Sequence, residues 1–221
     1  MIVTSLCTLS LIFLPGNSNA ASLFMQKDVF GGSQQWDTYD FLAVDDRLRG
    51  GSSQSYMEAF DSNNTAMFYG VLDTKTLGGA GFASQSVESP NVIFDFSYFS
   101  GLELSYLTSE KKYFTIDISN EYSAFLPNGS KPSTVEFQAV FTSEVGEAEG
   151  GGPQKVYLPF TDFTPVERGR PSKRPGLTLD LGSIRKVAFQ LRSFFDQQSG
   201  PFSINLIKLT CISVPYLKEQ N

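Results

Sequence analysis

The segment Asp45–Ser53 holds the densest set of chemically useful side chains in this 221-residue sequence. Adjacent carboxylates, two guanidinium groups and a glycine pair could hold an anion at the rim of a ligand-binding site. The same groups could instead form a buried ion-pair corner, with the glycines supplying positive φ angles for a sharp turn into the next strand. We favour the structural role, because the segment lies between two expected strands and lacks a nucleophile paired with a base. The residues concerned are Asp45, Asp46, Arg47, Arg49, Gly50 and Gly51.

A second charged segment, Thr164–Gly176, combines three prolines with four basic side chains. Its composition predicts a loop, since proline and glycine favour turns. The basic side chains could dock an acidic partner or a lipid headgroup, although such a run of charge is usually only a solvated face. The candidate docking residues are Arg168, Arg170, Lys173 and Arg174.

The glycine-rich segment Leu77–Phe82 superficially resembles a phosphate-binding loop. A phosphate loop needs a helix after it, whose N-terminus faces the phosphate. Here the residues that follow, Phe82–Ser86, predict a strand, and the Gly-Lys-Ser/Thr signature is missing. The glycines therefore indicate a bulge or a close approach between strands rather than a nucleotide site.

The types of residue that the sequence lacks also limit its chemistry. It contains no histidine, which is the commonest general base and metal ligand. Its two cysteines are Cys7 and Cys211, and the mature chain cannot form an internal disulfide if the N-terminal segment is removed. A zinc site built from cysteine and histidine is excluded. We therefore expect no catalytic residue, cofactor or metal site.

Carboxylates remain as the one route to catalysis. A glycosidase needs two of them facing one sugar, and sequence spacing cannot show such a pair. Calcium bound by aspartates and backbone carbonyls in a loop is a further alternative, although no EF-hand spacing is present. The aspartates considered for either role are Asp95, Asp117, Asp162, Asp180 and Asp196.

The N-terminal residues 1–22 are expected to be a signal or targeting segment. Ile2–Leu14 is an apolar run of the length of a signal-peptide core and too short to span a bilayer, so no integral membrane protein is predicted. A basic region before it is missing, and a plain hydrophobic strand is the alternative. Asn63 and Asn128 begin glycosylation sequons, which matter only in the secretory route. The net charge of −6 argues against nucleic acid as a partner.

Apolar and polar residues alternate with a period of two through most of the chain. Val135–Phe141 is one example, and Phe114, Ile116 and Ile118 alternate with polar residues in another. About nine or ten such strands, separated by turn signals, predict an antiparallel jelly-roll β-sandwich. The 20 phenylalanines and nine tyrosines suit an all-β chain. Without a long linker, residues 23–221 are expected to form a single domain.

Several motifs resemble, in order, those of the complex I intermediate-associated protein 30 family. They are Phe30-Gly31-Gly32, Trp36, the Asp45–Ser53 segment, Gly78–Ser84, Leu158-Pro159-Phe160, Arg168-Gly169-Arg170, Arg192–Phe195 and Gly200–Ile204. The similarity spans residues 29–212 and is greatest to short, single-domain fungal members. It implies a galactose-binding-like sandwich, related in shape to carbohydrate-binding modules. It also implies a mitochondrial, chaperone-like assembly role, whereas the N-terminal segment looks more secretory than mitochondrial.

Two functions therefore remain open. One is an assembly factor that binds unfolded or partly assembled protein subunits, including subunits of respiratory complex I. The other is a carbohydrate-binding module with a glycan partner, since exposed tyrosine or tryptophan can stack on sugar rings. Exposed, coplanar tyrosines on a concave sheet would favour the glycan, and buried aromatic residues would favour the protein partner.

Overall fold

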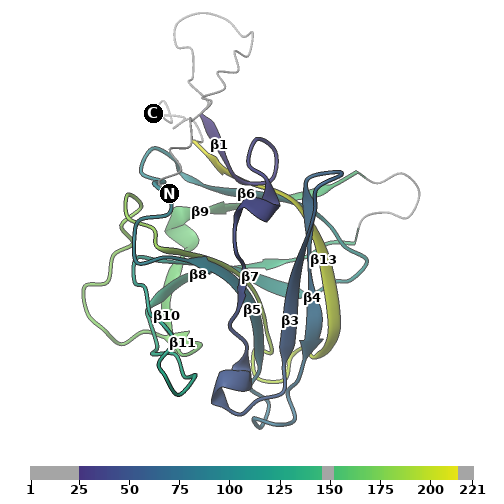
Figure 1. Cartoon of the computed structure of the whole chain (residues 1–221), viewed down its shortest axis with the longest axis vertical. Helices are drawn as coiled ribbons and strands as arrows, with labels where there is room; N and C mark the ends of the chain where they lie inside the picture. The colour runs from purple at the N-terminus through teal and green to yellow at the C-terminus, as the bar shows by residue number, and fades with distance from the viewer. Residues whose placement is uncertain (1–24, 146–151, 214–221) are drawn as a thin grey trace, which may run out of the picture.

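The computed structural model describes residues 25–145 and 152–213, which fold into two facing antiparallel sheets (Figure 1). The expected targeting segment, residues 1–22, lies outside the described residues. The six-stranded sheet has the order β3-β4-β13-β6-β9, with β1 paired to β13. Its strands are β1 (Gln26–Phe30), β3 (Gln54–Phe60), β4 (Thr65–Leu72), β6 (Gly101–Leu107), β9 (Gln154–Pro159) and β13 (Gly200–Ile212).

The seven-stranded sheet has the order β11-β10-β8-β7-β12-β5-β2. Its strands are β2 (Leu42–Ala43), β5 (Phe82–Glu88), β7 (Tyr113–Ser119), β8 (Glu136–Thr142), β10 (Thr164–Glu167), β11 (Arg170–Pro171) and β12 (Lys186–Arg192). Three short 3-10 helices complete the described elements: η1 (Trp36–Thr38), η2 (Asp46–Arg49) and η3 (Phe160–Asp162). The predicted antiparallel β-sandwich is confirmed.

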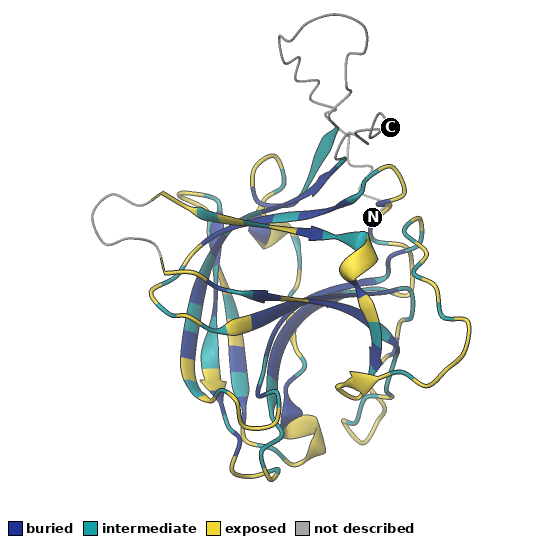
Figure 2. Ribbon diagram, turned by 180° about the vertical axis from the view of Figure 1, so that it is seen from behind, coloured by how far each residue is buried: buried dark blue, intermediate teal, exposed yellow. Residues whose placement is uncertain are grey.

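The alternation seen in the sequence places every second side chain of each strand in the core. In β7 and β12 the pairs Ile118↔Val187 and Phe114↔Leu191 share the inner face of the sheet, and all four side chains are buried. Phe68 of β4 reaches Phe114 across the sandwich, with ring centroids 6.3 Å apart. Burial of these rings drives the two sheets together. Figure 2 shows the resulting bands of buried and exposed residues along the strands.

One prediction about local structure was wrong. Thr164–Gly176 was expected to be a loop, but it begins with the hairpin β10–β11, in which Glu167 pairs with Arg170. Pro171 is tolerated in β11 because this strand lies at the edge of the sheet, where a missing N–H leaves no neighbouring strand without a partner. The two-residue turn Arg168-Gly169 has positive φ at both positions, as a tight hairpin turn requires.

The Phe30-Gly31-Gly32 motif anchors the N-terminal strand to a bulge in β13. The register with β6 shifts between Leu206 and Lys208, and the Ile207 carbonyl between them accepts a hydrogen bond from Trp36 Nε1 at 3.2 Å. Gly31 has a φ of +73°, and a Cβ there would lie 2.2 Å from the Ile207 carbonyl oxygen. Trp36 is buried, so its ring anchors the N-terminal segment to the core.

In the described residues, none of the helices is both long and apolar enough to traverse a bilayer.

Replacing Gly31 with alanine should destabilise the fold by about 3 kcal/mol, because the new Cβ meets backbone and the left-handed conformation is strained. Gly129→Ala is the matched control: its φ is +76° and no heavy atom lies within 4 Å of the new Cβ, so a loss of about 1 kcal/mol is expected. Urea unfolding measures both values. Equal losses in the two variants would contradict the anchoring role of Gly31.

Candidate functional site

The two aspartates at the start of η2 connect the two sheets. The Asp45 carboxylate accepts hydrogen bonds from Ser55 N–H (3.1 Å) and Oγ–H (2.6 Å) in β3, and from Ser84 N–H (3.0 Å) in β5. Strand β3 belongs to one sheet and β5 to the other. A charged carboxylate with several donors tolerates burial, because the hydrogen bonds replace those it made with water.

Asp46 makes a second connection of the same kind. Its carboxylate accepts hydrogen bonds from Ser53 N–H (2.9 Å), Ser53 Oγ–H (2.6 Å) and Phe82 N–H (3.2 Å). A Cβ at Gly51 would lie 2.3 Å from Asp46 Oδ1, so residue 51 must lack a side chain. The predicted positive φ occurs at Gly50 (+83°) but not at Gly51, whose role is to leave space.

The two arginines of the segment separate from each other. Arg47 Nη2 lies 3.1 Å from Asp45 Oδ2, although the Arg47 side chain is 50% exposed. Arg49 extends instead over the Phe82 ring, at 5.3 Å from its centroid, and lines a cleft. The segment therefore has a buried structural half and a half that faces the cleft.

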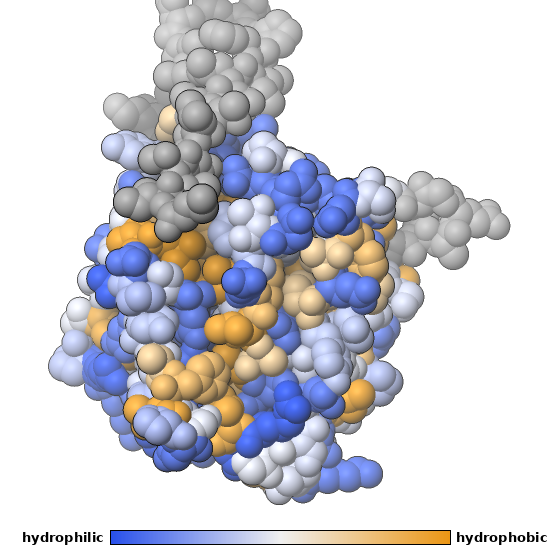
Figure 3. Space-filling model, viewed as in Figure 1, coloured by the Kyte–Doolittle hydropathy of each residue, from blue (hydrophilic) through white to orange (hydrophobic). Residues whose placement is uncertain are grey.

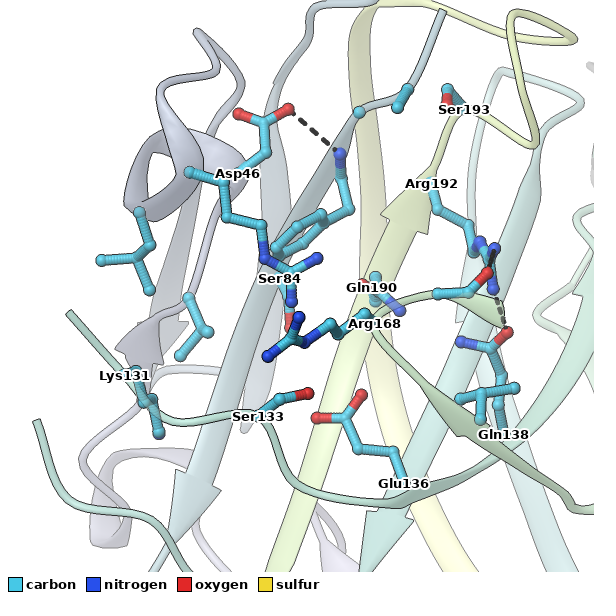
Figure 4. A pocket seen from close by; sticks show the side chains of 18 of the residues that line it. Asp46, Ser84, Lys131, Ser133, Glu136, Gln138, Arg168, Gln190, Arg192 and Ser193 are labelled. Carbon is cyan, nitrogen blue, oxygen red and sulfur yellow. Dashed lines mark hydrogen bonds between the residues drawn. The ribbon is translucent and has the colours of Figure 1, made fainter. Parts of the chain in front are cut away.

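The cleft lies on the outer face of the seven-stranded sheet and encloses about 420 Å³. Side chains from β5, β8 and β12 form its floor, and loops on several sides form its walls (Figure 4). The floor residues include Ser84, Gln138, Gln190 and Arg192, which occupy the strand positions opposite to those in the core. The wall residues include Leu48, Arg49, Leu77, Lys131, Ser133, Arg168, Phe194 and Phe195.

A buried carboxyl group organises the polar floor. Asp117 of β7 accepts hydrogen bonds from Gln138 Nε2 (2.9 Å) and Gln190 Nε2 (2.6 Å), and its exposed fraction is 1%. Arg192 Nη1 in turn donates to Gln138 Oε1 at 2.6 Å (Figure 4). Burial, assisted by the negative charge of Glu136, raises the pKa of Asp117 to about 7, although the Gln138 hydrogen bond opposes the rise.

Two lysines around this floor are each paired with a glutamate. Lys186 forms an ion pair with Glu136, and Lys131 forms one with Glu88. Burial opposes the charged form of Lys186, but the adjacent Glu136 carboxylate outweighs it and raises the lysine pKa. These contacts hold the side chains in place and leave neither lysine free as a proton acceptor.

The four basic residues of the expected docking segment do not act together. Arg168 lines the cleft, and Arg170 and Lys173 line a shallower depression beside it, together with Phe194 and Phe195. Arg174 points elsewhere and pairs with Glu121 (3.2 Å) and Glu167 (2.8 Å). The structure thus brings Arg168 close to Arg49, whereas from the sequence we assigned the two arginines to separate sites.

Several cleft residues were missed by sequence reasoning. Gln138 and Gln190 were interpreted only as the outer face of a sheet, and Asp117 was considered only for catalysis or calcium binding and not as part of a shared polar floor. The feature that could have revealed them is that all three are polar amide or carboxyl side chains at the outward positions of strands that lie side by side in the sheet, β8, β7 and β12. Phe194 and Phe195 carried no signal beyond the family resemblance.

The described cysteine takes no part in this site. The Cys211 thiol is buried in the core, and burial raises its pKa, so it is a poor nucleophile. Within residues 25–145 and 152–213, no three acidic or cysteine side chains gather closely enough to hold a metal ion. Of the aspartates considered for catalysis, only Asp117 lies beneath the cleft, and the side chains above it cover it.

The family model of complex I intermediate-associated protein 30 matches residues 29–206. The chain belongs to this family. An uncharacterised protein of the fission yeast Schizosaccharomyces pombe is 35% identical over 193 residues, which are 85% of each chain. Among solved structures, the chain is similar to the family 11 carbohydrate-binding module of the cellulosomal cellulase Lic26A-Cel5E of Clostridium thermocellum. That likeness has a TM-score of 0.52 and 14% identity, covers 95% of this chain and 97% of the module, and shows a shared jelly-roll fold.

Replacing Asp46 with asparagine should destabilise the protein by about 2–4 kcal/mol, because the amide leaves buried donors without an acceptor. Arg47→Gln removes a half-exposed ion pair of the same segment and should change stability by less than about 1 kcal/mol. Thermal and urea unfolding measure both. A loss in the Asp46 variant no larger than in the Arg47 variant would show that the corner does not hold the sheets together.

Asp117 should make the fold less stable as pH rises from about 4 to 7. Its folded pKa, about 7, exceeds the unfolded value, so the folded state binds the extra proton in this range and loses that advantage above it. Wild type should therefore lose roughly 3 kcal/mol more than Asp117→Asn between pH 4 and pH 8. The pKa of the exposed Asp95 carboxyl is lowered by hydrogen bonds from Ser97, so its stabilising contribution is lost only as pH falls below about 4. Asp95→Asn is therefore the control, and its loss of stability between pH 4 and pH 8 should be close to that of wild type. Parallel pH profiles of wild type and the Asp117 variant would refute the assignment.

Proposed function

We propose that this protein is a non-catalytic binding protein that assists the assembly of mitochondrial respiratory complex I by holding unfolded or partly assembled subunits. Membership of the complex I intermediate-associated protein 30 family is the observation that carries the proposal. The family and the fold shared with a carbohydrate-binding module are both of non-catalytic kinds.

The chemistry of the cleft supports binding rather than reaction. Glu136 and Asp117 are the acidic pair that a glycosidase would need, but Glu136 is engaged by Lys186 and Asp117 is covered by two glutamines. Two carboxylates that cannot both reach one substrate cannot share the acid and nucleophile roles. A rigid, mostly paired floor with loop walls can instead hold a segment of another macromolecule.

Surface composition agrees with a protein partner. The described residues that line the cleft include Phe82, Phe194 and Phe195 but neither tyrosine nor tryptophan. The face shown in Figure 3 carries small apolar patches among hydrophilic atoms, a surface that an incompletely folded chain could contact. Phe195 lines the cleft and is 62% exposed, so an apolar side chain of a partner could contact it.

A glycan is the second candidate partner, favoured by the fold shared with a carbohydrate-binding module. Among the described residues, those that line the cleft include neither of the aromatic types, tyrosine and tryptophan, that were expected to stack on sugars. Tyr56 and Tyr69 stack on each other, with centroids 5.2 Å apart, on β3 and β4 of the other sheet. Binding of the purified protein to a glycan array, abolished by substitutions in the cleft, would favour this alternative.

Cells that lack the protein should accumulate less complex I, as measured on native gels, and wild type should restore it. Phe195→Ser should restore at least several-fold less complex I. Tyr98→Ser changes an aromatic residue that is even more exposed (73%) but lies outside the lining of the cleft, and it should restore complex I fully. Immunoprecipitation with mass spectrometry should recover complex I subunits with wild type and Tyr98→Ser. Localisation of chains tagged at either end outside mitochondria, or unchanged complex I in the deleted cells, would refute the assembly role.

A further inference from the structure

Two arginines line the cleft without an anionic partner. Arg49 and Arg168 come from segments that are far apart in the sequence, and both line the same cavity, where Arg168 extends toward its centre (Figure 4). Among the described residues, neither guanidinium forms a salt bridge or a side-chain hydrogen bond. Partial burial of the exposed Arg49 side chain against the cleft, and next the positive charge of Arg168, lower the pKa of Arg49, while Glu136 and Asp46 act in the opposite direction.

Every other charged side chain described around the cleft is already engaged. Lys186 pairs with Glu136 and Lys131 with Glu88. Arg192 is held by Gln138 and by the Gly169 carbonyl oxygen, at 2.6 and 2.5 Å. The carboxylates Asp46 and Asp117 accept hydrogen bonds from the protein. The mouth of the cleft therefore keeps an excess of positive charge, although the whole chain carries −6.

Strained backbone presents the apolar wall beside these arginines. Phe194, Phe195 and Asp196 are consecutive non-glycine residues with φ of +47°, +58° and +68°, a conformation that costs about 1–2 kcal/mol per residue. The turn is held by hydrogen bonds from Ser193 N–H to the Gly81 carbonyl (2.9 Å) and from Asp196 N–H to the Gly79 carbonyl (2.9 Å). The glycine-rich segment thus supports the wall. Strain that exposes phenylalanine at a cleft, rather than burying it, is typical of a functional surface.

We propose that the cleft binds a short acidic segment of a partner protein, with one carboxylate between Arg49 and Arg168 and a neighbouring apolar side chain against Phe194 and Phe195. This inference rests on the proposed function, in which the partner is a protein. Two guanidinium groups match the two oxygens of a carboxylate. The acidic chain as a whole, and Glu136 close to Arg49, disfavour a polyanion such as nucleic acid or an anionic membrane.

The test uses the purified full chain and two capped pentapeptides, one with glutamate between two phenylalanines and one with glutamine in its place. Nitrogen-15 NMR follows the Nε–H signals of the arginines during titration. The glutamate peptide should shift the signals of Arg49 and Arg168 and bind at least tenfold more tightly than the glutamine peptide, since a charge-assisted hydrogen-bonded pair supplies such a factor. Added salt should weaken the preference.

Variants distinguish a specific effect of Arg49 and Arg168 from a general effect of positive charge on the surface. Arg49→Gln and Arg168→Gln should each lower the affinity for the glutamate peptide about tenfold and leave that for the glutamine peptide unchanged. Arg174→Gln, in the same basic segment but paired with Glu121 and Glu167, should change neither. Because the side chains of Arg49 and Arg168 are exposed, the variants should keep the fold, which the dispersion of the spectra verifies.

Equal affinity for the two peptides, or an equal loss in the Arg174 variant, would overturn the proposal. Shifts caused by inorganic phosphate or by phosphatidylserine vesicles, but not by the glutamate peptide, would overturn it in favour of a phosphate or membrane site. The peptide assay contains no complex I subunit. A negative peptide result would therefore leave the assembly role standing, and a failed assembly role would leave a glutamate-selective cleft standing.

Discussion

The hydrogen bonds of the buried carboxylates Asp45 and Asp46 are the interaction on which the cleft depends. They join η2 to β3 in one sheet and to β5 in the other, so the end of the sandwich cannot open without breaking these charge-assisted hydrogen bonds. Apolar packing holds the layers together but tolerates sliding, since it is not directional. Directed carboxylate contacts determine the position of η2, and thereby the point from which Arg49 enters the cleft.

The outer face of the seven-stranded sheet departs from an ordinary solvated face. Its polar side chains are buried beneath loops and bonded to one another, as Asp117 is to Gln138 and Gln190. Such a network is costly unless every member has a partner, and it then gives a rigid and specific surface. The unpaired arginines stand out against this background, because the protein pairs its other cleft charges internally.

Two proteins that share a fold need not bind the same ligand. The sandwich resembles a carbohydrate-binding module at 14% identity, and jelly rolls carry many unrelated sites. The described lining of the cleft includes phenylalanine and arginine but neither tyrosine nor tryptophan, the residues that we expected to stack on sugars. The proposed protein partner follows from that composition together with the family, and the site differs in chemistry from a sugar platform while keeping the same scaffold.

The sequence by itself determined the all-β class, most strand positions and the family, because period-two alternation and the Asp45–Ser53 and Phe30-Gly31-Gly32 motifs are local signals. It also led us to expect a structural role for the aspartates. Only the tertiary structure decided that Thr164–Gly176 begins with an edge hairpin, and that Arg168 lies with Arg49 while Arg174 does not. Strand order decides these placements: β10, β8, β7, β12 and β5 become neighbours through pairings between distant segments, which no window of sequence contains.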